Sequence, residues 1–167
     1  MLKILSKRTL SKIISYIQKL FIINTISIPL VLIDYYSKIT IYNFLTQYPY
    51  SYFRINQFLN FDLAFNYGIS FGILNNFKYG NIFFILNIII TLYLYYLAIS
   101  SQKLTRISYS IIIGGALGNL FNRYYMGAVV DFIDFHYKEY HFPTFNVADS
   151  LITIGTILLI YSMIKKS

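Results

Sequence analysis

The chain has 167 residues, of which 57% are hydrophobic and 12% are charged, with a formal net charge of +8. Soluble domains are about 25% charged, so this composition excludes an ordinary soluble domain and predicts a protein with several membrane spans. The basic residues flank apolar runs and do not cluster beside aromatic residues, so we expect no nucleic-acid partner. The chain contains no cysteine, which excludes disulfides and thiol chemistry.

Four apolar runs predict four transmembrane helices. A basic N-terminal segment precedes the first run, as in a cleavable signal peptide, but no small-x-small cleavage site follows, so we expect this span to be retained. The second run is long enough to cross about 30 Å of hydrocarbon at about 1.5 Å per residue. The expected spans of this single membrane domain cover about residues 17–36, 79–99, 107–125 and 147–164.

The longest segment between spans, about residues 37–78, is expected to lie on the outer surface. Its second half, RINQFLNFDLAFNYGISFG (54–72), alternates in places between apolar and polar residues, as short strands do, and is punctuated by Gly68 and Gly72. The expected fold is therefore a mainly α membrane protein, with four transmembrane helices and a small β-cradle and loops on the outer face.

The distribution of Lys and Arg predicts the orientation of the chain, because short cytoplasmic segments are enriched in these residues. They concentrate before the first span, in the link between the second and third spans, and at the C-terminus. Both termini are therefore expected to be cytoplasmic. Every Asp and Glu then lies at or beyond the outer ends of the spans, so the chemistry is expected to face outward.

Two aspartates stand on either side of the polar segment between the third and fourth spans. A hairpin between these spans can bring Asp131 and Asp149 face to face. Two carboxyl groups in a poorly hydrated site share a proton, so that one acts as base and the other as acid, and such a pair can activate water against an amide. The alternative is structural, since Asp149 with Asn146 near a helix start also fits a helix cap.

The third span places several polar or small residues on one helical face. Gly115, Asn119, Asn122 and Arg123 recur at intervals of three and four residues, toward the end of the span near Asp131. Arg123 would hold the aspartates or a substrate carbonyl, or it would anchor the span at the interface. Gly115 is expected to allow close helix packing rather than to contact substrate.

Two further pairs lie nearer the N-terminus. Asp34 and Lys38 stand four residues apart at the outer end of the first span, which predicts an ion pair with a structural role favoured over binding of a lipid phosphate. Asn66 and Gly68 combine an amide with a backbone position open to positive φ, a pattern more typical of a turn than of a binding loop.

A metal site is a competing interpretation of His136, Glu139 and His141 together with the nearby aspartates. Their spacing is not H-E-x-x-H, and we expect them in a short loop, where no helix fixes two imidazoles on one face. No G-x-S-x-G motif is present in the sequence. We therefore expect no metal, no other cofactor and no serine nucleophile.

Taken together, these motifs resemble the lipoprotein signal peptidases (signal peptidase II), which are bacterial membrane aspartic proteases. The resemblance runs from about Ile33 to Gly155. It follows the family's order through five motifs, namely DYYSK (34–38), NYGISFG (66–72), GGALGNLFNR (114–123), GAVVDF (127–132) and FNVADS (145–150). Each motif is weak alone, but five in order across four expected spans are specific.

The resemblance implies that Asp131 and Asp149 are the catalytic pair. The implied reaction removes the signal peptide from a diacylglyceryl-modified prolipoprotein by cleavage before the lipidated cysteine, at the outer face of the bacterial inner membrane. We expect the chain to act as a monomer among membrane lipids. The resemblance also implies supporting roles for Asp34, Lys38, Asn66, Gly68, Asn119, Arg123 and Asn146.

Two positions depart from the family's pattern. Asn122 stands where the family usually has Asp beside the arginine, and Tyr35 stands where it commonly has Gln after the first aspartate. Asn122 can donate and accept hydrogen bonds but carries no charge, which puts its pairing with Arg123 in question.

The alternative function from another class is a non-enzymatic membrane protein that uses its outer acids as an ion or proton relay. Relay carboxylates usually lie within spans and near the midplane of the membrane. No Asp or Glu lies near the middle of an expected span, so the sequence favours the peptidase.

Overall fold

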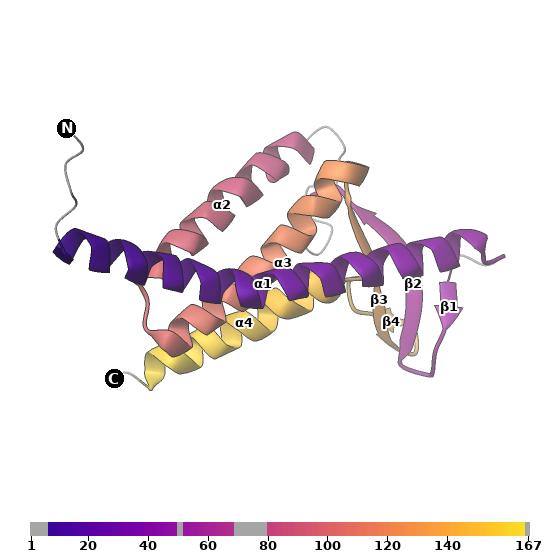
Figure 1. Cartoon of the computed structure of the whole chain (residues 1–167). Coiled ribbons are helices and arrows are strands. Elements are labelled where there is room, and N and C mark those ends of the chain that lie inside the picture. Colours follow the sequence, from indigo (N-terminus) through magenta and orange to yellow (C-terminus); the bar gives the residue numbers. More distant parts are fainter. Residues whose placement is uncertain (1–6, 50–51, 69–79, 166–167) are drawn as a thin grey trace.

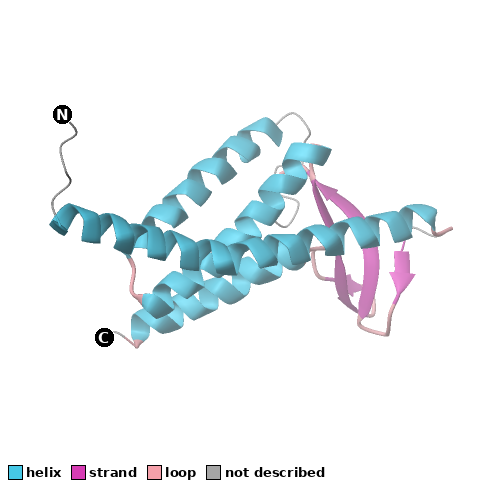
Figure 2. Ribbon diagram, in the orientation of Figure 1, coloured by secondary structure: helices cyan, strands magenta, loops and turns pink. Residues whose placement is uncertain are grey.

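A computed structural model describes residues 7–49, 52–68 and 80–165 of the chain. Four helices and a small antiparallel sheet make up this part, with the strands together at one end (Figure 2). The mainly α architecture with a small sheet confirms the expected fold class. The elements in chain order are α1 (Lys7–Gln47), β1 (Tyr52–Arg54), β2 (Leu59–Asn66), α2 (Gly80–Ser100), α3 (Lys103–Met126), β3 (Val129–Tyr137), β4 (Tyr140–His141) and α4 (Val147–Ile164).

Three of these helices, α1, α2 and α4, are long and apolar enough to cross a membrane. Helix α3 has a sufficient length of 24 residues. Its sequence contains serines, asparagines and two arginines, which lower its hydropathy, and it contacts each of the other three helices. The number of four spans and their bounds therefore stay predictions.

Helix α1 is longer than the span expected from the sequence. Its 41 residues extend about 60 Å at about 1.5 Å per residue, roughly twice the thickness of the hydrocarbon core. Residues 37–47, which we expected in the outer segment, continue the helix and reach the sheet (Figure 1). There the ring of Phe44 contacts Phe53 and that of Tyr42 contacts Phe65. Residues 69–79, including Gly72, lie outside the described residues.

Small residues let helix α3 approach its neighbours closely. A Cβ atom at Gly114 would lie 2.9 Å from Cβ of Leu30 on α1, and one at Gly118 would lie 2.5 Å from a carboxylate oxygen of Asp34.

Away from the sheet, a core of apolar side chains joins α1, α2 and α3. It is made up of Ile23, Ala98, Tyr109, Ile112 and Ile113. Helix α3 is thus the centre of the bundle.

The sheet has the strand order β1-β2-β3-β4, with all neighbours antiparallel. We expected strands only in the segment before the second span, whereas β3 and β4 come from the segment between the third and fourth spans. Gly127 ends α3 in the left-handed region (φ 70°), and its N–H donates to the carbonyl of Arg123. This αL cap turns the chain directly from α3 into β3.

The sheet lies at the C-terminal end of α3 and the N-terminal end of α4, and α1 begins and α4 ends at the opposite end of the molecule (Figure 1). The junction of β3, the end of α3 and the start of α4 is therefore the place where polar residues from all three elements can meet.

Candidate active site

Asp149 lies in the first turn of α4 and forms a capping box with Asn146. The Asn146 side-chain oxygen accepts from the backbone N–H of Asp149 at 3.0 Å, and a carboxylate oxygen of Asp149 accepts from the N–H of Asn146 at 3.3 Å. The first turn of a helix also favours a negative charge. The structural alternative, in which Asp149 caps a helix, is therefore present. The cap holds one carboxylate oxygen of Asp149 and thereby fixes the direction in which the other oxygen points.

Asp131 lies on β3 and is 3% exposed. Its Oδ1 accepts from Nδ2 of Asn146 at 2.5 Å, and its Oδ2 accepts from Nδ2 of Asn66 at 3.1 Å. These two amides hold both oxygens of a carboxyl group that has almost no contact with water.

Asn146 thus contacts both aspartates and brings them to one site. Its side-chain amide donates to Asp131 while its side-chain oxygen and backbone N–H bond Asp149. Asn119 on α3 adds a second link, since its Nδ2 donates to Asp149 Oδ1 at 2.8 Å and its Oδ1 accepts from Asn146 at 3.2 Å. The network orients the two carboxyl groups together, as the hairpin argument predicted.

Asp34 and Lys38 form the predicted ion pair, and both are buried. Lys38 Nζ donates to Asp34 at 2.8 Å and to Oδ1 of Asn119 at 2.8 Å. The other oxygen of Asp34 accepts from the backbone N–H of Ala148 at 2.8 Å. The pair therefore joins α1 to the first turn of α4 and fixes which side of the Asn119 amide faces Asp149.

Arg123 reaches the β2 strand end rather than the aspartates. Its Nη2 donates to the carbonyl of Gly68 at 2.6 Å, and the N–H of Gly68 donates to the side chain of Asn66 at 3.0 Å. The turn predicted at Asn66 and Gly68 is therefore linked to α3 and, through Asn66, to Asp131. Asn122 accepts from the N–H of Val130 at 2.5 Å, so it holds the start of β3 and makes no hydrogen bond to Arg123 among the described residues.

Gly115 has the packing role that its sequence context suggested. A Cβ atom there would overlap the carbonyl oxygen of Ala148 and lie 2.8 Å from the side chain of Ile152. The missing side chain lets the start of α4 lie directly against α3, which brings Asp149 within reach of Asn119.

The environment of the pair perturbs the protonation of Asp131. Burial, together with the nearby charge of Asp149, raises the pKa of Asp131 to about 7, although hydrogen bonds from Asn66 and Asn146 oppose the shift. A carboxyl group with such a pKa can hold a proton near neutral pH and still release it, as a general acid requires.

A partly apolar hollow of about 490 Å³ opens beside the two aspartates. Asp131 and Asp149 line it together with aromatic and aliphatic side chains, among them Phe135, Phe142 and Phe145. An extended apolar peptide or an acyl chain placed there would lie against both carboxyl groups.

The expectation that His136 and His141 lie in a loop is wrong. They face each other across the β3–β4 hairpin, and their rings stack with centroids 5.1 Å apart. Of the nearby aspartates, Asp134 is the one that joins them, since its carboxylate accepts from Nδ1 of His141 at 2.8 Å. The D-x-H spacing of Asp134 and His136 within β3 puts both side chains on one face of the strand.

A model of the signal peptidase (SPase) II family matches residues 26–165. The chain belongs to the signal peptidase II family. It is 49% identical to the lipoprotein signal peptidase of Rickettsia felis over 138 residues, which cover 81% of this chain and 70% of that protein. It is 45% identical to the lipoprotein signal peptidase of Rickettsia prowazekii over 153 residues, covering 87% and 79% respectively.

Two solved structures of a bacterial membrane enzyme have the same fold as this signal peptidase II family member. The first, at 2.3 Å resolution, has a TM-score of 0.71 and 36% identity, and the match covers 86% of this chain and 87% of that one. The second, at 1.9 Å resolution, has a TM-score of 0.70 and 36% identity, with coverage of 87% and 94%.

Membership in the signal peptidase II family confirms the predicted function, the removal of signal peptides from prolipoproteins, and the assignment as a protease. It does not favour the ion-relay alternative. With the apolar helices, it also places the chain in the bacterial inner membrane as a multi-pass protein. The roles of individual residues do not follow from these matches.

Proposed function

We propose that Asp131 and Asp149 hydrolyse the peptide bond before the lipid-modified cysteine of a prolipoprotein, and that the other predicted residues position them. Asp131 holds the shared proton and donates it to the scissile carbonyl, while Asp149 is ionised and deprotonates the attacking water. The observation that carries this proposal is that Asn146 donates to both carboxyl groups, from its side-chain amide to Asp131 and from its backbone N–H to Asp149. Two carboxyl groups held in this way supply a base to the attacking water and an acid to the scissile carbonyl.

The supporting residues act through this network. Asn119 and Asn146 orient the carboxyl groups, and the buried Asp34–Lys38 pair keeps the Asn119 amide in the orientation that donates to Asp149. Arg123 fixes Gly68 and thereby the turn that carries Asn66. Gly115 permits the contact between α3 and α4 on which these bonds depend.

We further propose that the site faces the outer side of the membrane, with both termini cytoplasmic and membrane lipids around a monomer. The basic side chains that mark the cytoplasmic side in sequence belong to the start of α1, the α2–α3 link and the end of α4. These lie at the end of the molecule away from the sheet (Figure 1).

The test of substrate class compares two precursors that differ only in the diacylglyceryl group on the cysteine. We expect the purified protein in detergent to cleave the modified precursor and to leave the unmodified one intact, because the acyl chains would occupy the hollow beside Asp131 and Asp149. Mass spectrometry of the product should identify the modified cysteine as its new N-terminus. Equal cleavage of both precursors, or a new N-terminus elsewhere, would contradict the proposed specificity.

The raised pKa of Asp131 predicts the pH dependence of cleavage. Since Asp131 acts as the acid, kcat/KM should fall as the pH rises through about 7, approaching a tenfold loss per pH unit. The hydrogen bond from Asn66 lowers the pKa of Asp131, so Asn66→Ala should move this alkaline limb to higher pH. A pH–rate profile of both proteins checks the sign. A limb that moves to lower pH in Asn66→Ala would assign the proton to another group.

A further inference from the structure

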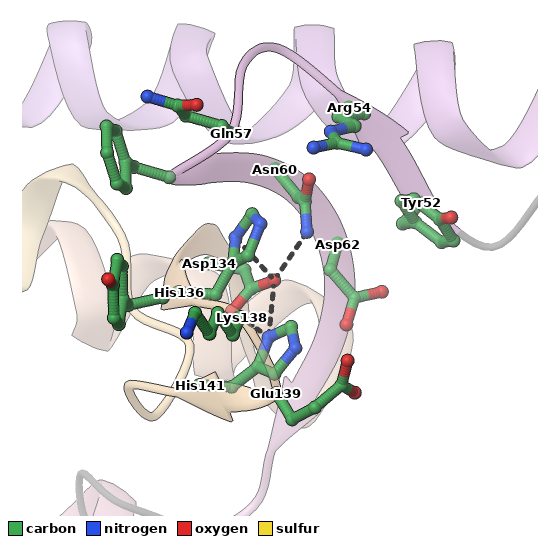
Figure 3. A pocket seen from close by; sticks show the side chains of 12 residues that line it. Tyr52, Arg54, Gln57, Asn60, Asp62, Asp134, His136, Lys138, Glu139 and His141 are labelled. Carbon is green, nitrogen blue, oxygen red and sulfur yellow. Dashed lines mark hydrogen bonds and ion pairs between the residues drawn. The ribbon is translucent and has the colours of Figure 1, made fainter.

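Asp134, His136 and His141 form a second polar cluster in the sheet (Figure 3). One ligand atom from each lies within 4.8 Å of the others. Nδ1 of His141 is 2.8 and 2.9 Å from the two carboxylate oxygens of Asp134, and Nδ1 of His136 is 4.0 Å from one of them. Both imidazoles therefore converge on one carboxyl group.

The pleat of β3 separates this cluster from the catalytic pair. Successive side chains of a strand point to opposite faces, so Asp134 and His136 share one face and Asp131 lies on the other. The hollows beside the sheet agree with this, since Asp131 and Phe135 line one and Asp134 and His136 line another. The cluster is thus distinct from the candidate active site although both use β3.

Local structure fixes the two histidines opposite each other. The β3–β4 register pairs His136 with His141, and the turn between them contains Lys138 with φ 53°. From the neighbouring strand, Asn60 lies opposite Asp134 and donates to its carboxylate at 3.0 Å. Three strands therefore converge on the cluster, which is a more rigid frame than the loop expected from the sequence.

Two buried polar atoms at this cluster have no hydrogen-bond partner among the described residues. They are Nδ1 of His136, whose side chain is only 10% exposed, and Oδ1 of Asn60, which is 7% exposed as a residue. Buried polar groups in folded proteins nearly always have a partner. Nδ1 of His136 lies 4.0 Å from a carboxylate oxygen of Asp134. A cation between these two atoms would be bound by both of them.

The charge balance also favours a bound cation. Asp134 is 4% exposed and forms no ion pair with a Lys or Arg among the described residues. The Arg and Lys side chains that line this hollow contact other groups, since Arg54 donates to the carbonyl of Asn56 and Lys138 lies over the ring of Tyr137. Burial and the charge of Asp134 raise the pKa of Asp62 in the same hollow.

We propose that Asp134, His136 and His141 bind one divalent transition-metal ion, for which Zn²⁺ is the best match. Two imidazole nitrogens and one carboxylate oxygen are a ligand set that Zn²⁺ prefers, whereas Mg²⁺ and Ca²⁺ prefer oxygen ligands throughout. The hollow of about 880 Å³ around the cluster gives the ion access from water and room for a water ligand.

The distances suit such an ion after small side-chain movements. Tetrahedral bonds of about 2.1 Å place neighbouring ligand atoms about 3.4 Å apart. The distances from Asp134 to His141 and His136, 2.8 and 4.0 Å, lie on either side of this value. Replacing the His141–Asp134 hydrogen bond by two metal bonds draws His136 inward. The bound ion would join the β3–β4 hairpin to β2 through Asp134 and Asn60.

The test uses the two histidines of the chain, which are its only ones. Full-length protein labelled with ¹⁵N-histidine, purified in detergent with a tag that lacks histidine and stripped of metal, is titrated with Zn²⁺. We expect the ring nitrogen signals of both histidines to shift together and to saturate at one Zn²⁺ per chain, with a rise in Tm. Absence of a shift, or a shift of one histidine only, would overturn the proposal.

Variants distinguish this site from other acids of the chain. Asp134→Asn, which keeps the size of the side chain, and His141→Gln, at an exposed position, should each lower Zn²⁺ affinity by at least about tenfold. Glu139→Gln is the matched control from the same hairpin, and it should leave the affinity unchanged. Asp131→Asn should also leave it unchanged. Unchanged affinity in Asp134→Asn, or loss of binding in Asp131→Asn, would refute the assignment, with circular dichroism verifying the fold of each variant.

Discussion

Asp131→Asn and Asp149→Asn should each reduce cleavage of a lipid-modified precursor by at least about a thousandfold. A general acid or base typically contributes about 10² to 10⁴ to the rate, and an amide can neither donate the required proton nor accept one from water. Asn66 and Asn146 donate to different oxygens of Asp131, so the single oxygen of an asparagine at position 131 can accept only one of these two hydrogen bonds. Circular dichroism of each variant is expected to show a retained fold beside the loss of activity. Initial rates with the purified variants measure the effect.

The matched control for these two variants is Glu139→Gln. Glu139 is an exposed acid in the turn after β3 and contacts neither aspartate in any hydrogen bond of the described residues. The substitution replaces a carboxylate by an amide, as the other two do, on the β3–β4 hairpin that also carries Asp131. It should leave the rate of cleavage within about twofold of that of the protein without substitutions, since isolated surface changes are nearly neutral. Turnover within about tenfold of that protein in Asp131→Asn or Asp149→Asn would show that the pair does not carry the chemistry.

Gly115→Ala should have the next largest effect, because it separates α3 from the start of α4. The new Cβ would overlap the carbonyl oxygen of Ala148, a backbone atom that can move only with its helix. Overpacking of this kind costs about 1–3 kcal/mol of stability. It also lengthens the hydrogen bond from Asn119 to Asp149, and a displacement of about 1 Å in a catalytic group costs about a hundredfold in rate.

Gly155→Ala is the control that separates misplacement of the catalytic pair from general instability. Gly155 also packs against α3, where its Cβ would lie 2.6 Å from the side chain of Ile112 and 3.1 Å from the carbonyl of Ser108. It lies further along α4 from Asp149, so we expect a comparable fall in Tm with a smaller loss of kcat in the folded protein. Equal kcat for the two variants would contradict the positioning role of Gly115.

The residues of one helix that lie together in the active site could be predicted, because residues three or four apart in a helix share a face. Gly115, Asn119 and Arg123 share a face at intervals of four residues, and the structure places that face toward α4 and the turn after β2. The ion pair of Asp34 and Lys38 follows from the same spacing. Both sets of neighbours depend only on the spacing of residues along one helix.

Strand pairing could not be predicted in the same way. Strand β3 is buried on both faces over its first half, and the polar residues of VVDFIDFHY stand at unequal intervals, so the sequence lacks the alternation of a half-exposed strand. Its partner β2 lies more than sixty residues earlier in the chain, and the β-bulge between Phe61 and Ala64 shifts the register. The convergence of Asn60, Asp134 and His141 depends on this pairing, and so the sequence alone did not reveal it.

The length of α1 has a consequence for where cleavage occurs. Because α1 is one continuous helix that reaches the strands, we expect its depth and tilt in the bilayer to set the height of the two aspartates relative to the lipid. A thicker or thinner bilayer changes that tilt. The distance of a substrate's peptide bond from the hydrocarbon boundary therefore decides whether that bond meets the two aspartates.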